Sequence, residues 1–164
     1  MKRTVLYAVI GILTLLVPVK RLDVAKLRPV EVIYIYQADG RVVLETDTQD
    51  MGVGDSAAQA LEDMRSTSPA VIYLDTAEFL LIGKDCEEHA EALRGELKES
   101  VRLCRVAGTP DLQLAAKYLS AHGDLPTFRA WKADTRLPRI HIEKEVIKKL
   151  KKGEKVLDKQ LVFC

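Results

Sequence analysis

The sequence contains few aromatic, cysteine and histidine residues, and these shortages exclude several kinds of site. Aromatic residues make up only 5% of the chain, which argues against a protein that stacks bases or sugars on its surface. The three cysteines and three histidines lack both the paired spacing of a zinc site and the HExxH pattern of a metalloprotease. A Gly-x-Ser-x-Gly nucleophile elbow is also missing. The sequence therefore predicts no nucleic-acid partner, no cofactor and no recognisable catalytic centre.

A short apolar run lies close to the N-terminus. Residues 4–19 are a run of 16 mostly apolar residues, preceded by Lys2 and Arg3. A helix of that length spans ~24 Å, slightly less than the ~30 Å hydrocarbon core of a bilayer. A basic start and an apolar centre are typical of an export signal, and no A-x-A-like cleavage site follows. We therefore interpret residues 1–21 as an uncleaved signal anchor, with a cleaved signal as the alternative.

The charges around this run give two opposite indications of orientation. Basic residues follow it at positions 20, 21, 26 and 28, and the positive-inside rule would keep that side cytoplasmic. A basic and then apolar start this close to the N-terminus usually acts as a signal, which sends the rest of the chain outward. We expect a cell-membrane protein with a single N-terminal anchor and a soluble domain outside the cytoplasm.

The remaining residues, 27–164, have a size typical of one domain. Residues 30–36 and 41–46 are rich in β-branched and apolar side chains and flank Asp39-Gly40. Two strand-like runs around an Asp-Gly pair are a strong signal for a β-hairpin. The soluble domain is therefore expected to begin with a hairpin.

Helix and strand signals alternate downstream of the hairpin. Helices are expected to begin at Asp55 or Ser56, at a capping box of Asp85 with Glu88, and at Thr109-Pro110. This order predicts an α/β (α+β) domain with a mixed sheet of about six strands and three or four helices packed on the sheet. The further strand-like runs are residues 70–74, 79–82, 101–107, 139–142 and 155–163.

An acidic, glycine-containing stretch precedes the first expected helix. Asp47, Asp50 and Asp55 are candidate ligands for a hard cation such as Ca²⁺, although their spacing does not match an EF-hand loop. Gly52-x-Gly54-x-x-Ala57 resembles a dinucleotide fingerprint, but the three carboxylates oppose a bound phosphate. The simpler interpretation is a loop with a tight turn that uses glycine at positive φ. A small metal- or phosphate-dependent enzyme module centred on Asp47–Asp55 is the alternative function.

Cys86 and Cys104 both fall on inward-facing stripes of the expected helix and strand. In an exported domain the two thiols could form a disulfide. They could equally be two small apolar residues of the core, which their positions favour.

The charge of the chain is distributed unevenly. Residues 31–100 contain 16 acidic and 5 basic side chains, whereas residues 127–164 contain 11 basic and 5 acidic ones. Four ammonium groups within one short segment must face water or an anionic partner, because burying unpaired charges costs several kcal/mol. An anionic membrane surface is one such partner. The candidate surface-interaction residues lie in the basic segment 144–159 and are Lys148, Lys149, Lys151 and Lys152.

Three stretches resemble a known family: residues 54–61, residues 79–83 and residues 101–108. Together with the hairpin they resemble the N-terminal domain of the C subunit (a Ger(x)C-type lipoprotein) of bacterial spore germinant receptors. The shared features are a glycine-started helix, a strand ending in Ile-Gly and a later strand ending in a small residue and Gly. The resemblance covers residues 31–119. It implies a non-catalytic accessory or protein-binding domain that is attached to the outer face of a membrane and contacts other membrane or envelope proteins.

Overall fold

The computed structural model describes residues 26–121, 124–132 and 136–140. Over these residues it contains eight β-strands in two sheets and three α-helices, which confirms the predicted mixed α/β class. The larger sheet has six strands in the order β4-β3-β2-β6-β7-β8. These strands are β2 (Val32–Ala38), β3 (Arg41–Thr46), β4 (Met51–Gly54), β6 (Phe79–Ile82), β7 (Arg102–Val106) and β8 (Arg139–Ile140).

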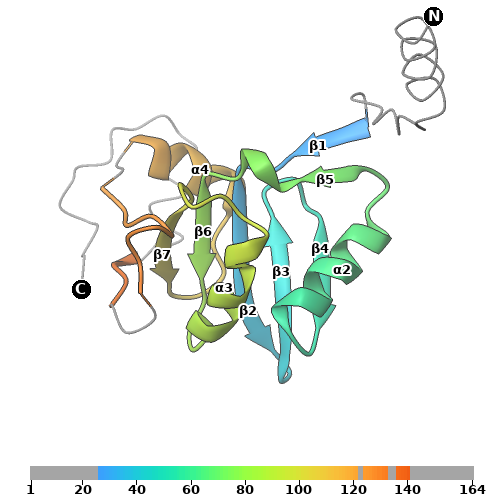
Figure 1. Cartoon of the computed structure of the whole chain (residues 1–164), viewed down its shortest axis with the longest axis horizontal. Helices are drawn as coiled ribbons and strands as arrows, with labels where there is room; N and C mark the ends of the chain where they lie inside the picture. Colours follow the sequence, from blue (N-terminus) through green and yellow to red (C-terminus); the bar gives the residue numbers. More distant parts are fainter. Residues whose placement is uncertain (1–25, 122–123, 133–135, 141–164) are drawn as a thin grey trace, which may run out of the picture.

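The six-stranded sheet combines an antiparallel meander with parallel strands. β2 and β3 pair around Asp39 and Gly40, whose φ angles are 51° and 75°. Because a two-residue turn of this type needs positive φ at both positions, the predicted hairpin is confirmed. β4 pairs antiparallel with β3, whereas β6, β7 and β8 continue on the other side of β2 and run parallel to it. The carboxyl ends of these four parallel strands therefore share one edge of the sheet, and β2, β6 and β7 point the same way in Figure 1.

Helices cover both faces of this sheet. Alternate side chains of a strand point to opposite faces, so Ile33 joins the core with α2 and α3 while Tyr34 joins the core with α4. Figure 1 shows α2 and α3 in front of the sheet. This arrangement agrees with the prediction of helices packed on a mixed sheet. The helices are α2 (Ala57–Thr67), α3 (Glu87–Ala92) and α4 (Leu112–Ala121).

A strand, β4, stands where the sequence predicts a loop at residues 47–54. Gly52 and Gly54 have extended backbone conformations, so the expectation of glycine at positive φ was wrong. A Cβ atom on Gly52 would lie 2.6 Å from the backbone nitrogen of Met64, and one on Gly54 would lie 2.6 Å from that of Ala60. The two glycines are therefore needed because α2 packs directly against the backbone of β4.

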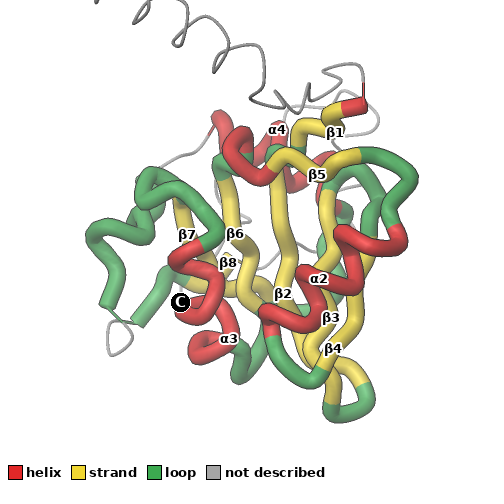
Figure 2. Tube along the Cα trace, turned by 45° about the vertical axis from the view of Figure 1, so that its right-hand side comes forward, coloured by secondary structure: helices red, strands yellow, loops and turns green. Residues whose placement is uncertain are grey.

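A second, two-stranded sheet was not predicted. β1 (Leu27–Pro29) pairs parallel with β5 (Val71–Tyr73), and Figure 2 shows the two strands side by side at one end of the larger sheet. Residues 70–74 were expected to form a buried strand. Instead Val71 and Tyr73 are exposed and only the alternate residues Ile72 and Leu74 are buried, because β5 covers the end of the sheet and has one face in solvent.

The starts of the helices agree only in part with the predicted caps. Ser56 is the N-cap of α2 and its hydroxyl accepts a hydrogen bond from the backbone nitrogen of Gln59 at 3.3 Å, as predicted. The capping box at Asp85 is absent, since the N-cap of α3 is Cys86 and makes no side-chain cap bond.

The third predicted start was also displaced along the chain. α4 begins at Leu112 and not at Thr109-Pro110. The reason is Asp111, whose carboxylate accepts a hydrogen bond from the backbone nitrogen of Leu114 at 3.2 Å. A side-chain acceptor for the free amides of the first turn outweighs the preference of proline for the first helical position.

Cys86 and Cys104 are both free and buried. Cys86 belongs to the core that contains α2 and α3, whereas Cys104 belongs to the core that contains α4, so the sheet separates the two thiols. The interpretation as small core residues is confirmed, and the alternative of a disulfide between them was wrong. Burial raises the pKa of Cys104 to about 12, which makes this thiol unreactive at neutral pH.

Several predictions fall outside the described residues. These are the signal anchor at residues 1–21, the strand at residues 155–163 and the basic segment 144–159 with its four lysines. Among the helices that the structure does describe, none has the length and apolar character needed to span a bilayer.

Candidate functional site

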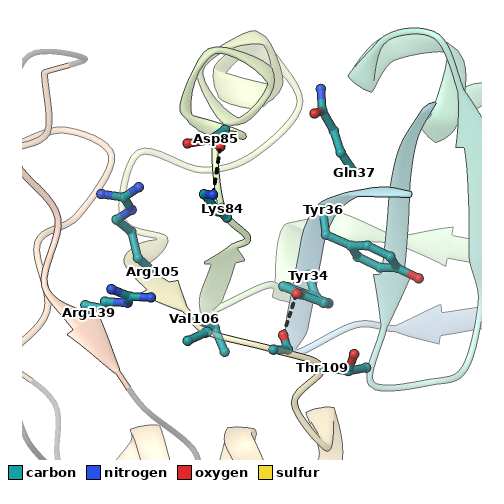
Figure 3. Close-up of a pocket in the computed structure, with 11 residues that line it drawn as sticks. Tyr34, Tyr36, Gln37, Lys84, Asp85, Arg105, Val106, Thr109 and Arg139 are labelled. Atoms are coloured by element: carbon teal, nitrogen blue, oxygen red, sulfur yellow. Dashed lines mark hydrogen bonds and ion pairs between the residues drawn. The ribbon is translucent and has the colours of Figure 1, made fainter. Parts of the chain in front are cut away.

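A cleft of about 550 Å³ lies at the carboxyl ends of the parallel strands. Crevices in this position, outside the carboxyl ends of parallel strands, are the usual ligand sites of open α/β sheets, and this volume falls within the range of small-molecule sites. Figure 3 shows two arginines on one side of the cleft and two tyrosines on the other. The side chains used in the argument below are Tyr34, Tyr36, Lys84, Asp85, Arg105 and Arg139.

The tyrosine wall is held by a hydrogen bond and by ring stacking. The hydroxyl of Tyr34 donates a hydrogen bond of 2.7 Å to the carbonyl oxygen of Gly108, and the rings of Tyr34 and Tyr36 stack with centroids 4.8 Å apart. Burial, with smaller contributions from neighbouring groups, raises the pKa of Tyr34 to about 12, so this phenol remains a neutral donor. The bond to Gly108 fixes the turn after β7, where φ is +84°, and thereby shapes the floor of the cleft.

The opposite wall is basic. Arg105 of β7 and Arg139 of β8 are direct partners in the parallel register. Glu87 at the start of α3 forms an ion pair with Arg105, with Nε and Oε1 2.8 Å apart. Lys84 extends from the loop after β6 and lies 3.9 Å from the carboxylate of Asp85, and both of these side chains are largely exposed. Three basic groups and one acidic group therefore line the cleft itself.

The three basic groups are suited to binding an anion. Guanidinium and ammonium groups donate hydrogen bonds to oxyanions at any ordinary pH. Of the described nucleophilic side chains, the thiols of Cys86 and Cys104 are buried in the cores. His89 contacts the amide of Gln37, with the two nitrogens 3.1 Å apart. The cleft therefore offers donors for a negatively charged group, beside the hydroxyl of Thr109 and the carboxylate of Asp85.

The structure gives separate roles to the aspartates predicted as cation ligands. Asp47 accepts hydrogen bonds at one carboxylate oxygen from the backbone nitrogens of Glu31 and Val32, at 3.1 and 3.2 Å. Asp50 is almost fully buried and binds other side chains, whereas Asp55 is exposed at the start of α2. Within the described ranges no three His, Cys, Asp or Glu side chains form a group that could hold a metal ion. This geometry gives the metal hypothesis no support.

We expect Ca²⁺ and Mg²⁺ to leave the melting temperature of the protein unchanged, because the oxygens of Asp47 and Asp50 already accept hydrogen bonds from the protein. The measurement is a thermal melt across a titration with each cation. A cation that binds the folded protein and is present at a concentration of 100 times its Kd would add about 2.7 kcal/mol to the free energy of unfolding. A rise of several degrees in the melting temperature that is absent in the Asp50→Asn variant would contradict this expectation and support a cation site.

Comparisons of the chain with protein-family models, with curated proteins and with solved structures found no match. The resemblance to the germinant-receptor C subunit therefore stays a prediction. The cleft is interpreted from its own geometry.

Proposed function

We propose that this chain is a membrane-anchored accessory domain on the outer face of the cell membrane, which holds a partner in the cleft and does not catalyse a reaction. The observation that carries the binding role is the position of the cleft at the carboxyl ends of β2, β6, β7 and β8, with the exposed charges of Lys84, Asp85 and Arg139 in its lining. The membrane attachment is supported by the basic and then apolar sequence of residues 1–21. The resemblance to a germinant-receptor subunit favours another membrane or envelope protein as the partner.

Cysteine labelling tests the orientation and the occupancy of the cleft together. Thr109 lies in the lining of the cleft and is exposed, and the side chain of Lys98 is exposed outside the cleft. In a Cys164→Ser background, Thr109→Cys and Lys98→Cys each provide one reactive thiol, since Cys86 and Cys104 are buried. We expect a membrane-impermeant maleimide to label Lys98→Cys in intact cells as fast as in the purified protein. It should label Thr109→Cys several-fold more slowly in cells, because the partner covers the cleft.

Two results would contradict this proposal. If neither variant is labelled until the cells are opened, the domain faces the cytoplasm and the predicted orientation is wrong. If both variants are labelled in cells at the rates of the purified protein, the cleft is empty in the cell and the binding role fails.

A further inference from the structure

The paired arginines at the carboxyl ends of β7 and β8 create a charge that the described part of the chain does not balance. Arg105 and Arg139 project from the same face because they are register partners in parallel strands, and Figure 3 shows both on one side of the cleft. Like charges on neighbouring strands repel each other. Glu87 compensates Arg105, but no carboxylate among the described residues forms an ion pair with the exposed Arg139.

Two neighbouring arginines lower the stability of the fold unless carboxylates or a bound anion compensate their charges. Arg102, at the other end of β7, shows the contrast: its guanidinium is paired with Glu78 at 2.9 Å and lies 4.1 Å above the centre of the Phe79 ring. Arg139 has neither kind of partner in the described ranges, and it lines the cleft together with Lys84. The charge at the cleft is therefore concentrated where a ligand can reach it, whereas the charge of Arg102 is used within the fold.

We propose that Arg105 and Arg139 bind an oxyanion, a carboxylate or a phosphate group, of the partner in the cleft, with Lys84 as a third cationic contact. This inference rests on the proposed function and names the chemistry of that site. A guanidinium presents a planar fork of donors that matches an oxyanion with two parallel hydrogen bonds. Glu87 holds Arg105 through Nε and so fixes the direction of one of the two forks before the anion arrives. The stacked tyrosines on the far wall leave an apolar surface for the rest of the ligand.

The oxyanion has two sources, a small soluble molecule or an acidic side chain of a protein partner. Three probes separate them: malonate, inorganic phosphate and a short peptide rich in Asp and Glu. Each is titrated into the full chain in nonionic detergent by calorimetry. The variants are Arg139→Gln and Arg139→Lys, with Arg65→Gln as a matched control that removes the same charge. Arg65 lies in the last turn of α2, outside the cleft, in an exposed ion pair with Glu96.

We expect at least one probe to bind the parent protein, and to bind less tightly as the salt concentration rises. Arg139→Gln should weaken that binding by about tenfold or more, as expected for the loss of charge-assisted hydrogen bonds. Arg139→Lys should weaken it less, because it keeps the charge but loses the fork, and Arg65→Gln should bind like the parent. Tight peptide binding with weak malonate and phosphate binding assigns the oxyanion to a protein partner, and the reverse assigns it to a small molecule.

Failure of all three probes to bind overturns the inference, as does binding that neither Arg139 variant changes. Trp131 is buried in the core, so its fluorescence reports whether each variant is folded. If Arg139→Gln does not fold, Arg139→Lys provides the test. These results are independent of the labelling experiment. A cleft that is covered in cells but binds no anion removes the arginine inference and leaves the proposed function in place.

Discussion

Replacing Gly52 with alanine is expected to destabilise the protein by about 3 kcal/mol, at the upper end of the usual cost of overpacking a core. The added Cβ would lie 2.6 Å from both the backbone nitrogen and the Cβ of Met64, and closer still to the carbonyl oxygen of Ala60. Backbone atoms within a helix cannot move aside individually, so α2 must shift away from β4 as a unit. The measurement is denaturant unfolding followed by the fluorescence of Trp131, the single tryptophan of the chain.

Gly95→Ala is the matched control for this substitution. A Cβ on Gly95 meets nothing within 4 Å, and its φ is not positive. Alanine there should be neutral or slightly stabilising, since it reduces the freedom of the unfolded chain. If Gly52→Ala unfolds at the same denaturant concentration as Gly95→Ala, then α2 does not pack on β4 as described.

Asp50→Asn is expected to destabilise the protein by about 2 kcal/mol, because it weakens a buried network of charge-assisted hydrogen bonds. Arg28 donates to both carboxylate oxygens of Asp50, at 3.0 and 3.1 Å. The hydroxyls of Thr48 and Ser68 donate at 2.7 and 2.8 Å. Asp50 thus joins β1, the start of β4 and the end of α2, and its loss should loosen the contact between the two sheets.

The effect of Asp50→Asn should depend on pH. Burial by itself would raise the pKa of Asp50, but the hydrogen bonds from Thr48, Ser68 and Arg28 and the charge of Arg28 outweigh it and lower the pKa below its usual value. Because the folded-state pKa is the lower one, the stabilisation is complete above the unfolded-state pKa of about 3.9 and is lost as the pH falls through the folded-state value. The stability difference between parent and variant should therefore be constant near neutral pH and shrink below about pH 4.

Unfolding measured from pH 7 to pH 2.5 checks this expectation, with the exposed Asp55→Asn as the control that should match the parent throughout. A difference between Asp50→Asn and the parent that is the same at acidic and neutral pH would show that the ionised carboxylate adds nothing to stability.

The elements that could be predicted from the sequence are those fixed by neighbouring residues. Asp39-Gly40 determines the hairpin, because the two positive φ angles are a local property of that pair. Ser56 determines the start of α2 for the same kind of reason, since its cap bond reaches only to Gln59. β4 was missed because glycines disfavour strands. Glycine is needed at position 52 because α2 contacts its backbone, and the local sequence does not indicate that contact.

The cleft could not be predicted because its residues are brought together by the order of the strands. Tyr34, Arg105 and Arg139 are far apart in the sequence and meet only because β2, β6, β7 and β8 are parallel and their carboxyl ends share an edge. One signal was present. Arg105 is one of two charged residues, with Arg102, in the otherwise apolar run at residues 101–107, and a charged residue near the end of a buried strand indicates either an ion pair or a site. Here it has both an ion pair with Glu87 and a place in the cleft.

The two ends of β2 separate the point where the chain enters the domain from the cleft. The chain enters the domain through β1, just before β2 begins at Val32, and the cleft lies where β2 ends. Seven residues of strand make a spacer of ~20 Å at ~3.3 Å per residue. That distance is about twice the Debye length of ~8–10 Å in physiological salt. If the domain faces a membrane with the β1 end of β2, the surface potential of that membrane is largely screened at the arginine pair, and anion binding there follows the ionic strength of the medium rather than the lipid composition.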